Sequence, residues 1–176
     1  MKKEEKFSTC FLILILKIVS VITNEYRISC PEMCSCDFTR GRGSKPSLNE
    51  NTKLKCGGRE YPGFSIQDLN FSSVESYITQ LEISQSGITH LENSFLKLHS
   101  LQKLDLSKNE IDKIDIKAFK NLGNLRRLDL SYNKITEIQS EIFEPLQSLE
   151  RLKINHNLLV HVYDGSFDFL ISLKQL

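Results

Sequence analysis

The chain has 176 residues, which is enough for one domain with a substantial apolar core. Its 23 lysine and arginine residues against 22 acidic residues give a net formal charge of +1, without the basic excess that is typical of nucleic-acid-binding proteins. Tryptophan is absent, and leucine and isoleucine carry most of the apolar content, which favours a repeated aliphatic core.

Residues 1–23 have the layout of a secretory signal peptide. Charged residues at the start are followed by an apolar run from Phe7 to Ile22, and the chain turns polar at Thr23. This run is shorter than the roughly 20 residues that a membrane-spanning helix needs, although an uncleaved anchor remains the alternative. We expect cleavage after Ser20 or Thr23, and a mature chain that is secreted or lies on the extracellular face of the plasma membrane.

Removal of this segment leaves four cysteines, an even number in an oxidising compartment. They are Cys30, Cys34, Cys36 and Cys56. Two disulfide bonds are therefore expected. A zinc site is the alternative, but the fourth cysteine stands alone, whereas structural zinc sites usually take their ligands in close pairs. We predict neither a metal ion nor any other cofactor.

Residues 37–55 are polar and rich in glycine and serine, which predicts a flexible loop. Arg40, Arg42 and Lys45 give this loop a positive charge suited to a sulfated glycan. Short charged loops are more often simply solvated, so solvation is the competing interpretation.

Asn70 begins the only Asn-x-Ser/Thr sequence in the chain. In a secreted protein this sequence accepts an N-linked glycan when the asparagine is exposed. We therefore predict glycosylation at Asn70.

Residues 78–172 contain four copies of one pattern. Three copies of 24 residues align without gaps, and an earlier copy is one residue shorter. The copies cover residues 78–100, 101–124, 125–148 and 149–172, and residues 173–176 open a fifth.

Each copy opens with the period-two pattern of a short strand. In LQKLDL the apolar Leu104 and Leu106 alternate with Lys103 and Asp105, and the apolar spacing then changes as the chain returns over another surface. Neither piece can bury its apolar side alone, so the copies must stack, with their strands in one parallel sheet. Stacking also places one phenylalanine per copy in a column, namely Phe95, Phe119, Phe143 and Phe167.

Asparagine recurs at one register after the strand, at Asn109, Asn133 and Asn157, and Ser86 replaces it in the shorter copy. The amide group has two donor hydrogens and an acceptor oxygen, enough to satisfy peptide groups that are left unpaired as the strand bends away. We predict that these asparagines are structural and do not bind a ligand.

The full pattern, L-x-x-L-x-L-x-x-N-x-I-x-x-I-x-x-x-x-F-x-x-L-x-x, resembles the typical 24-residue leucine-rich repeat of extracellular animal proteins. The cysteine segments CPEMCSC and LKC are similar to the amino-terminal cap of that family, which would occupy residues 24–77 here. The resemblance covers residues 30–176. It implies an α/β solenoid, a horseshoe with short parallel strands on its concave face and irregular or short helical arcs on its convex side, capped by disulfides at the amino end.

The family resemblance also implies that Cys30 pairs with Cys36 and Cys34 with Cys56. Stereochemistry by itself argues only against a bond between Cys34 and Cys36, which would close a strained ring across one residue. The two other connectivities remain open on that ground.

Strand alternation turns the polar positions of each coil toward the open sheet face, where stacking arranges them in columns. The candidate partner-binding residues at these positions are Lys103, Asp105, Lys108, Arg127, Asp129, Tyr132, Arg151, Lys153 and His156. A further column on this face is expected from Ser84, Ser107, Ser131 and Asn155. Neighbouring strands lie about 4.8 Å apart, so the basic column is repulsive unless the acidic column beside it offsets the charge, as we expect.

Arg127, Tyr132 and Arg151 are the strongest candidates for contact with a partner, because arginine and tyrosine dominate binding hot spots. His156 is the natural place for any pH sensitivity. The simpler alternative for most of these polar residues is that they keep an exposed sheet soluble.

No catalytic motif is present, since the four histidines have no close spacing with acids and there is no phosphate loop or nucleophile motif. We predict a non-enzymatic module that binds an extracellular protein, as the resemblance to Toll-like, Slit-like and adhesion ectodomains implies, and that does not bind nucleic acid. A structural matrix protein, similar to the small leucine-rich proteoglycans, is the alternative. Because a solenoid needs a cap at each end, we expect a longer receptor or adhesion protein, with any membrane attachment beyond Leu176.

Overall fold

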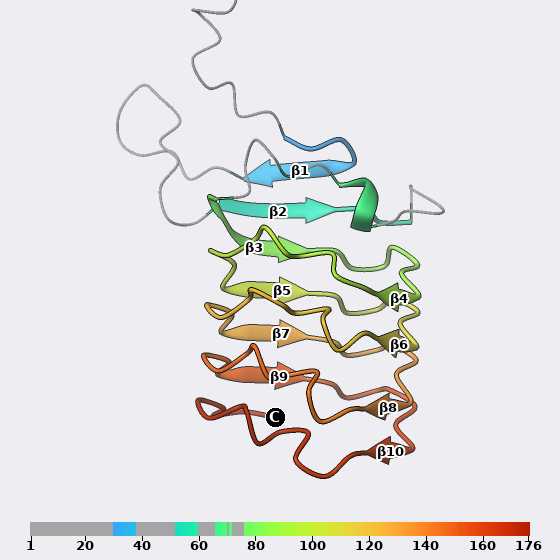
Figure 1. Ribbon diagram of the computed structural model, residues 1–176. Coiled ribbons are helices and arrows are strands. Elements are labelled where there is room, and N and C mark those ends of the chain that lie inside the picture. Colours follow the sequence, from blue (N-terminus) through green and yellow to red (C-terminus); the bar gives the residue numbers. More distant parts are fainter. Residues whose placement is uncertain (1–29, 38–51, 60–65, 70, 72–75) are drawn as a thin grey trace, which may run out of the picture.

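A six-stranded sheet runs the length of the molecule in the computed structural model, which describes residues 30–37, 52–59, 66–69, 71 and 76–176 (Figure 1). Its strands, in spatial order, are β1 (Cys34–Asp37), β2 (Thr52–Cys56), β3 (Ile78–Glu82), β5 (Lys103–Asp105), β7 (Arg127–Asp129) and β9 (Arg151–Lys153). The first pair is antiparallel and every later pair is parallel. The solenoid predicted from the repeats is therefore confirmed.

A second line of two-residue strands, which the sequence did not predict, follows the other side of the coils (Figure 1). These strands are β4 (His90–Leu91), β6 (Lys113–Ile114), β8 (Glu137–Ile138) and β10 (His161–Val162). They form two parallel pairs, β4 with β6 and β8 with β10. In the described ranges the only helix is the 3-10 helix η1 (Ile66–Asp68), so the return arcs of the repeats are irregular and not helical. None of the helical structure in these ranges has the length and apolar content to cross a membrane.

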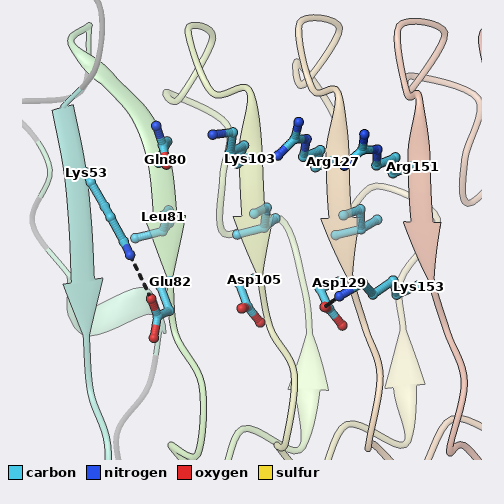
Figure 2. A pocket seen from close by; sticks show the side chains of 12 residues that line it. Lys53, Gln80, Leu81, Glu82, Lys103, Asp105, Arg127, Asp129, Arg151 and Lys153 are labelled. Carbon is cyan, nitrogen blue, oxygen red and sulfur yellow. Dashed lines mark ion pairs between the residues drawn. The ribbon is translucent and has the colours of Figure 1, made fainter.

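The parallel strands are paired without any shift of register between the repeats. Lys103 lies opposite Arg127, and Arg127 lies opposite Arg151 (Figure 2). Equivalent residues of successive copies are therefore neighbours across the sheet, as the repeat predicted.

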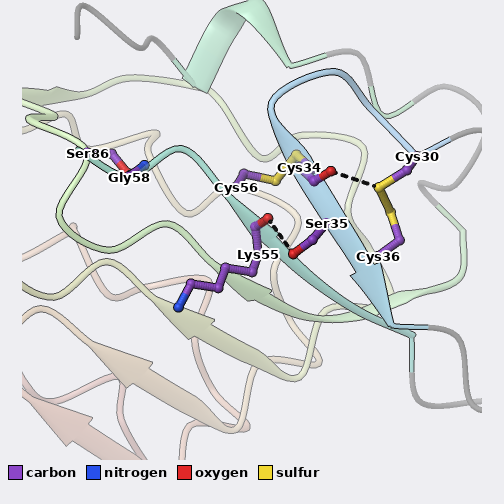
Figure 3. Close-up of a disulfide and its surroundings, with 8 residues drawn as sticks. All are labelled: Cys30, Cys34, Ser35, Cys36, Lys55, Cys56, Gly58 and Ser86. Carbon is purple, nitrogen blue, oxygen red and sulfur yellow. Dashed lines mark hydrogen bonds between the residues drawn. A yellow bond between two sulfur atoms is a disulfide. The ribbon is translucent and has the colours of Figure 1, made fainter. Parts of the chain in front are cut away.

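Two disulfides close the amino-terminal end of the sheet (Figure 3). They join Cys30 to Cys36 and Cys34 to Cys56, which confirms the pairing that the family resemblance implies. The second bond links directly opposed residues of β1 and β2. These strands also correct the predicted loop over residues 37–55, because Asp37 ends β1 and residues 52–55 belong to β2.

The strand β2 was missed because its neighbouring polar residues dominated the composition of the segment. Its burial nevertheless alternates, with Thr52, Leu54 and Cys56 buried and Lys53 and Lys55 exposed. That is the period-two pattern of a strand with one face in the core. The predicted signal peptide, the residues of the basic loop and the glycosylation candidate Asn70 lie outside the described residues.

Leucine and isoleucine side chains from the inner face of each strand fill the core, together with the column of phenylalanines. The rings of Phe119 and Phe143 stack with centroids 6.2 Å apart, and those of Phe143 and Phe167 with centroids 5.9 Å apart. Phe95 is also fully buried. Three members of the predicted aromatic column therefore stack on one another, and the fourth, Phe95, is buried in the same core.

The buried asparagines join each coil to the one before it. Asn133 Oδ1 accepts a hydrogen bond from the backbone N–H of Ile111 at 3.1 Å, and its Nδ2 donates to the carbonyl oxygens of Leu106 and Leu130 at 3.0 Å each. Asn109 and Asn157 make the same kind of bonds one coil earlier and one coil later. The predicted structural role is confirmed.

Ser86 occupies the asparagine position where the repeats meet the cap. Its Oγ accepts a hydrogen bond from the backbone N–H of Gly58 at 2.9 Å and donates to the carbonyl oxygen of Ser84 at 3.1 Å (Figure 3). The backbone N–H of Ser86 donates to Asn109 Oδ1 of the next coil at 2.9 Å. A shorter side chain therefore makes the same type of link where the preceding segment is not a full repeat.

Residues 173–176 extend the stack beyond the fourth copy. The backbone N–H of Leu152 donates to the carbonyl oxygen of Gln175 at 3.0 Å, and the N–H of Lys174 donates to the carbonyl oxygen of Glu150 at 2.9 Å. Large apolar side chains of the last coil are exposed, with Val160 at 87% and Ile171 at 77% of their full accessible area.

Replacement of Asn133 by alanine is expected to lower the free energy of unfolding by about 3 kcal/mol, because it leaves four buried peptide groups without this partner. Urea denaturation of the oxidised protein measures the change. Asn124→Ala is the matched control, since the exposed Asn124 makes a single bond, to the carbonyl oxygen of His99, and its loss is expected to cost less than about 1 kcal/mol. Equal losses for the two variants would contradict the role of the buried asparagines.

Candidate functional site

The open face of the six-stranded sheet carries a charged hollow with a volume of about 270 Å³ (Figure 2). Five basic and three acidic side chains line this hollow, which gives it a net formal charge of +2. The charged lining residues are Lys53, Glu82, Lys103, Asp105, Arg127, Asp129, Arg151 and Lys153. Six of the predicted partner-binding residues are thus brought together on one surface.

Two parallel rows organise these charges. The first, which we call the basic row, consists of Lys103, Arg127 and Arg151, and it is bounded by Gln80 on one side and Gln175 on the other. The second, the acidic row, consists of Glu82, Asp105 and Asp129 on β3, β5 and β7, two residues beyond Gln80, Lys103 and Arg127 on the same strands. Lys153 continues the register of the acidic row on β9.

Glu82 at one end of the acidic row is paired with two lysines of β2. Its carboxylate lies 2.8 Å from Lys55 Nζ and 3.2 Å from Lys53 Nζ. The hydrogen bond from Lys55 is the main cause that lowers the pKa of Glu82 below its ordinary value, against an opposing effect of burial. The same contact raises the pKa of Lys55.

Asp129 at the other end is paired with Lys153, whose Nζ lies 3.0 Å from Oδ2. Both the hydroxyl and the backbone N–H of Ser131 donate to Asp129 Oδ1. Burial tends to raise the pKa of Asp129, but the bonds from Ser131 and Lys153 together lower it below its ordinary value. The central Asp105 accepts a bond from the backbone N–H of Ser107 at 2.9 Å.

The basic and acidic rows lie side by side but are not joined by direct ion pairs among the described residues, so the expected offset of their charges stays a prediction. In the part of the chain that the structure describes, none of the three basic side chains forms an ion pair, whereas Glu82 and Asp129 pair with lysines on adjacent strands. The reason is geometric, since Lys55 lies directly opposite Glu82, and Lys153 directly opposite Asp129, across a strand spacing of about 4.8 Å. A basic side chain of the same strand starts two residues away, about 6.6 Å along the strand.

The third predicted column is corrected at two of its four positions, because Ser131 has only 5% of its surface exposed and Ser107 is buried as well, whereas Ser84 is half-buried and Asn155 is exposed. Their backbone N–H groups bond to the aspartates two residues earlier, which turns the chain out of the strand. These serines therefore shape the end of the strand and do not contribute to the open face.

The fourth column lies in the turns that follow the strands. Gln85, Lys108, Tyr132 and His156 have backbone φ values of 56° or 57°, the left-handed conformation. The rings of Tyr132 and His156 stack with centroids 4.2 Å apart, and Tyr132 remains 50% exposed. The turns thus hold an aromatic pair in place beside the charged hollow, at a conformational cost that side chains other than glycine usually avoid.

Lys53 and Lys55 are functional candidates that the sequence analysis missed, because they fell within the segment interpreted as a loop. The alternation of Thr52, Leu54 and Cys56 with the two lysines was the signal that could have placed them on a strand. Among the described residues there is no cluster of three or more histidine, cysteine or acidic side chains able to hold a metal ion.

Comparison with known proteins places the repeats in a family. The family model described as leucine rich repeat matches residues 76–135 and 123–176, which together make up more than half of the chain. This chain belongs to the leucine-rich repeat family. A curated relative, leucine-rich repeat-containing protein 3 of Danio rerio, is 30% identical over 114 residues, which cover 64% of this chain and 37% of the relative.

Solved structures of Toll-type proteins are similar to this leucine-rich repeat chain. The structure of a TLR13–ssRNA13 complex matches with a TM-score of 0.58 and 34% identity, over 60% of this chain and 15% of that one. The structure of the Toll–Spatzle complex of Drosophila matches with a TM-score of 0.54 and 27% identity, over 56% of this chain and 13% of that one. The chain therefore spans about a third of the curated relative and a smaller part of the Toll-type chains.

The paired carboxylates predict a stability that depends on acid pH. Because the pKa values of Glu82 and Asp129 are lowered by folding, their contribution is fully present above the ordinary values of 4.5 and 3.8 and is lost as the pH falls through the lowered values. Urea denaturation across this range should show unfolding free energy decreasing toward low pH, and Lys153→Gln should reduce the part that Asp129 contributes. An unchanged pH profile in this variant would contradict the pairing.

Proposed function

We propose that this chain is part of an extracellular recognition module that binds a protein through the open sheet face. The observation that carries the proposal is the basic row, three cationic side chains side by side on a rigid sheet with no carboxylate partner among the described residues. The paired strands fix the backbone positions of these residues, so binding does not have to order the backbone that carries them. The stacked Tyr132 and His156 extend the same surface with residue types suited to contact.

The extracellular location is supported by two independent features. The disulfides of the cap form and persist in oxidising compartments such as the cell exterior. The first 23 residues have the composition of a secretory signal peptide. The similarity to Toll, whose structure was solved in a complex with Spatzle, agrees with a role in binding an extracellular protein.

The similar TLR13 structure contains ssRNA13, so nucleic acid is the main competing ligand. A nucleic acid carries one negative charge per phosphate and is bound by surfaces that are basic throughout. Here the acidic row lies beside the basic row, and lysines and hydrogen bonds lower the pKa values of its members Glu82 and Asp129. The face therefore favours a protein partner, whose surface also mixes both signs of charge.

The open sheet face of these four coils is smaller than a typical stable protein interface. A stable protein interface engages about 20–30 residues on each side. Four coils with three or four outward positions each offer fewer, so we propose that edges of the sheet or further repeats of a longer receptor or adhesion protein complete the interface.

A glycan placed on the face tests this proposal. Asp105→Asn creates the sequence Asn-Leu-Ser on the open sheet face, and a glycan attached there in a secretory host should abolish binding to extracellular proteins and to intact cells. The asparagine side chain keeps the oxygen that accepts the bond from Ser107, so the fold should be unaffected. Binding is measured by surface plasmon resonance against a defined panel of extracellular domains.

Two controls separate the glycan from other effects. Asp105→Asn combined with Ser107→Ala makes the same charge change without an acceptor sequence, and it should bind like the unmodified protein. Lys134→Asn creates Asn-Ile-Thr between β7 and β8, away from the hollow, and its glycan should leave binding intact. Loss of binding with the glycan at position 134 and retention with the glycan at position 105 would refute recognition by the open face.

A further inference from the structure

The basic row differs in one respect from the other charges of the open sheet face. Lys53, Lys55 and Lys153 are held by carboxylates of the acidic row, whereas Lys103, Arg127 and Arg151 form no ion pair within the described ranges. Figure 2 shows the three unpaired side chains next to one another, on the same edge of the hollow, with Gln80 beside them. Among the cationic side chains that line the hollow, those without an ion pair are thus confined to one row.

We propose that the basic row is a subsite for carboxylate groups of an acidic protein segment that lies across strands β5, β7 and β9. This inference rests on the proposed function and names the chemistry of the partner at the same face. The segment runs along the axis of the solenoid, because the row crosses the strands instead of following one of them.

The dimensions of the row favour a short group of carboxylates. Three cations on neighbouring strands span two strand spacings, about 10 Å. The row ends at the uncharged amides Gln80 and Gln175, which can donate hydrogen bonds but add no charge. Two or three acidic side chains on one surface of a protein segment fill this length.

The electrostatics of the row also favour a carboxylate ligand. Like charges on neighbouring strands repel one another, so an anion that bridges them removes a repulsion as well as adding an attraction. The guanidinium groups of Arg127 and Arg151 each offer a planar pair of donors that matches the two oxygens of a carboxylate. Because the acidic row begins about 6.6 Å away along the strands, an anion wider than one row meets repulsion.

The test measures binding of the purified, oxidised full chain to a hexaglutamate peptide with blocked ends, by isothermal titration calorimetry at low salt. A hexaglutamine peptide of the same length is the uncharged reference. We expect saturable binding of hexaglutamate alone, and displacement of the Arg127 and Arg151 side-chain NMR signals on its addition. The double variant Arg127→Gln/Arg151→Gln should weaken binding about tenfold.

A matched control removes the same charge elsewhere. Lys117 and Lys120 are exposed on the return arc of the second repeat, so Lys117→Gln/Lys120→Gln should change the affinity less than about twofold. The conservative pair Arg127→Lys/Arg151→Lys keeps the charge but loses the planar donors, and it should weaken binding by about threefold. Circular dichroism confirms that each variant is folded.

Several outcomes would overturn the subsite. They are the absence of saturable binding, equal weakening in the control pair, or tighter binding of a single-stranded RNA or a heparin oligosaccharide of equal charge. The glycan experiment separates this failure from failure of the proposed function. If a glycan at position 105 blocks a partner that the double arginine variant still binds normally, recognition by the face stands and the carboxylate subsite is wrong.

Discussion

Hydrogen bonds from buried asparagines to two coils at once are the constraint on which the rest of this structure depends. A coil of 24 residues cannot bury its own apolar side, and its bend away from the strand leaves peptide groups unpaired. Asn133 satisfies groups of its own coil and of the preceding one, and Asn109 and Asn157 repeat the arrangement. These bonds fix one coil directly on the next, so equivalent residues become neighbours across the sheet.

That fixed register gives the open face its chemistry. It brings Lys103, Arg127 and Arg151 together although they are 24 residues apart in sequence, and it places Lys55 and Lys153 directly opposite Glu82 and Asp129. Pairing across strands then joins Glu82 and Asp129 to lysines and leaves the basic row without an ion pair among the described residues. A surface that the composition describes as electrically balanced thus acquires a cationic row.

Most of the fold could be predicted because each copy of the repeat contains the same strand, turn and core positions. The spacing of Leu104, Asn109 and Phe119 gives strand, turn and core in each copy, and the family resemblance implied the disulfides. The loss of Ser131 to the interior could not be predicted from alternation, because the chain leaves the strand there to form its bond with Asp129. The ion pairs of Glu82 could not be predicted either, because they come from Lys53 and Lys55 of β2. The sequence analysis had interpreted these lysines as part of a polar loop.

NMR titration of the individual carboxyl groups tests most directly whether Glu82 and Asp129 are neutralised by their cross-strand lysines and not by the basic row. The account predicts that replacing Lys103, Arg127 and Arg151 by glutamine leaves the pKa values of Glu82 and Asp129 nearly unchanged. Lys153→Gln should raise the pKa of Asp129, and Lys55→Gln should raise that of Glu82. Large increases for both carboxyl groups in the variant without the basic row would contradict it.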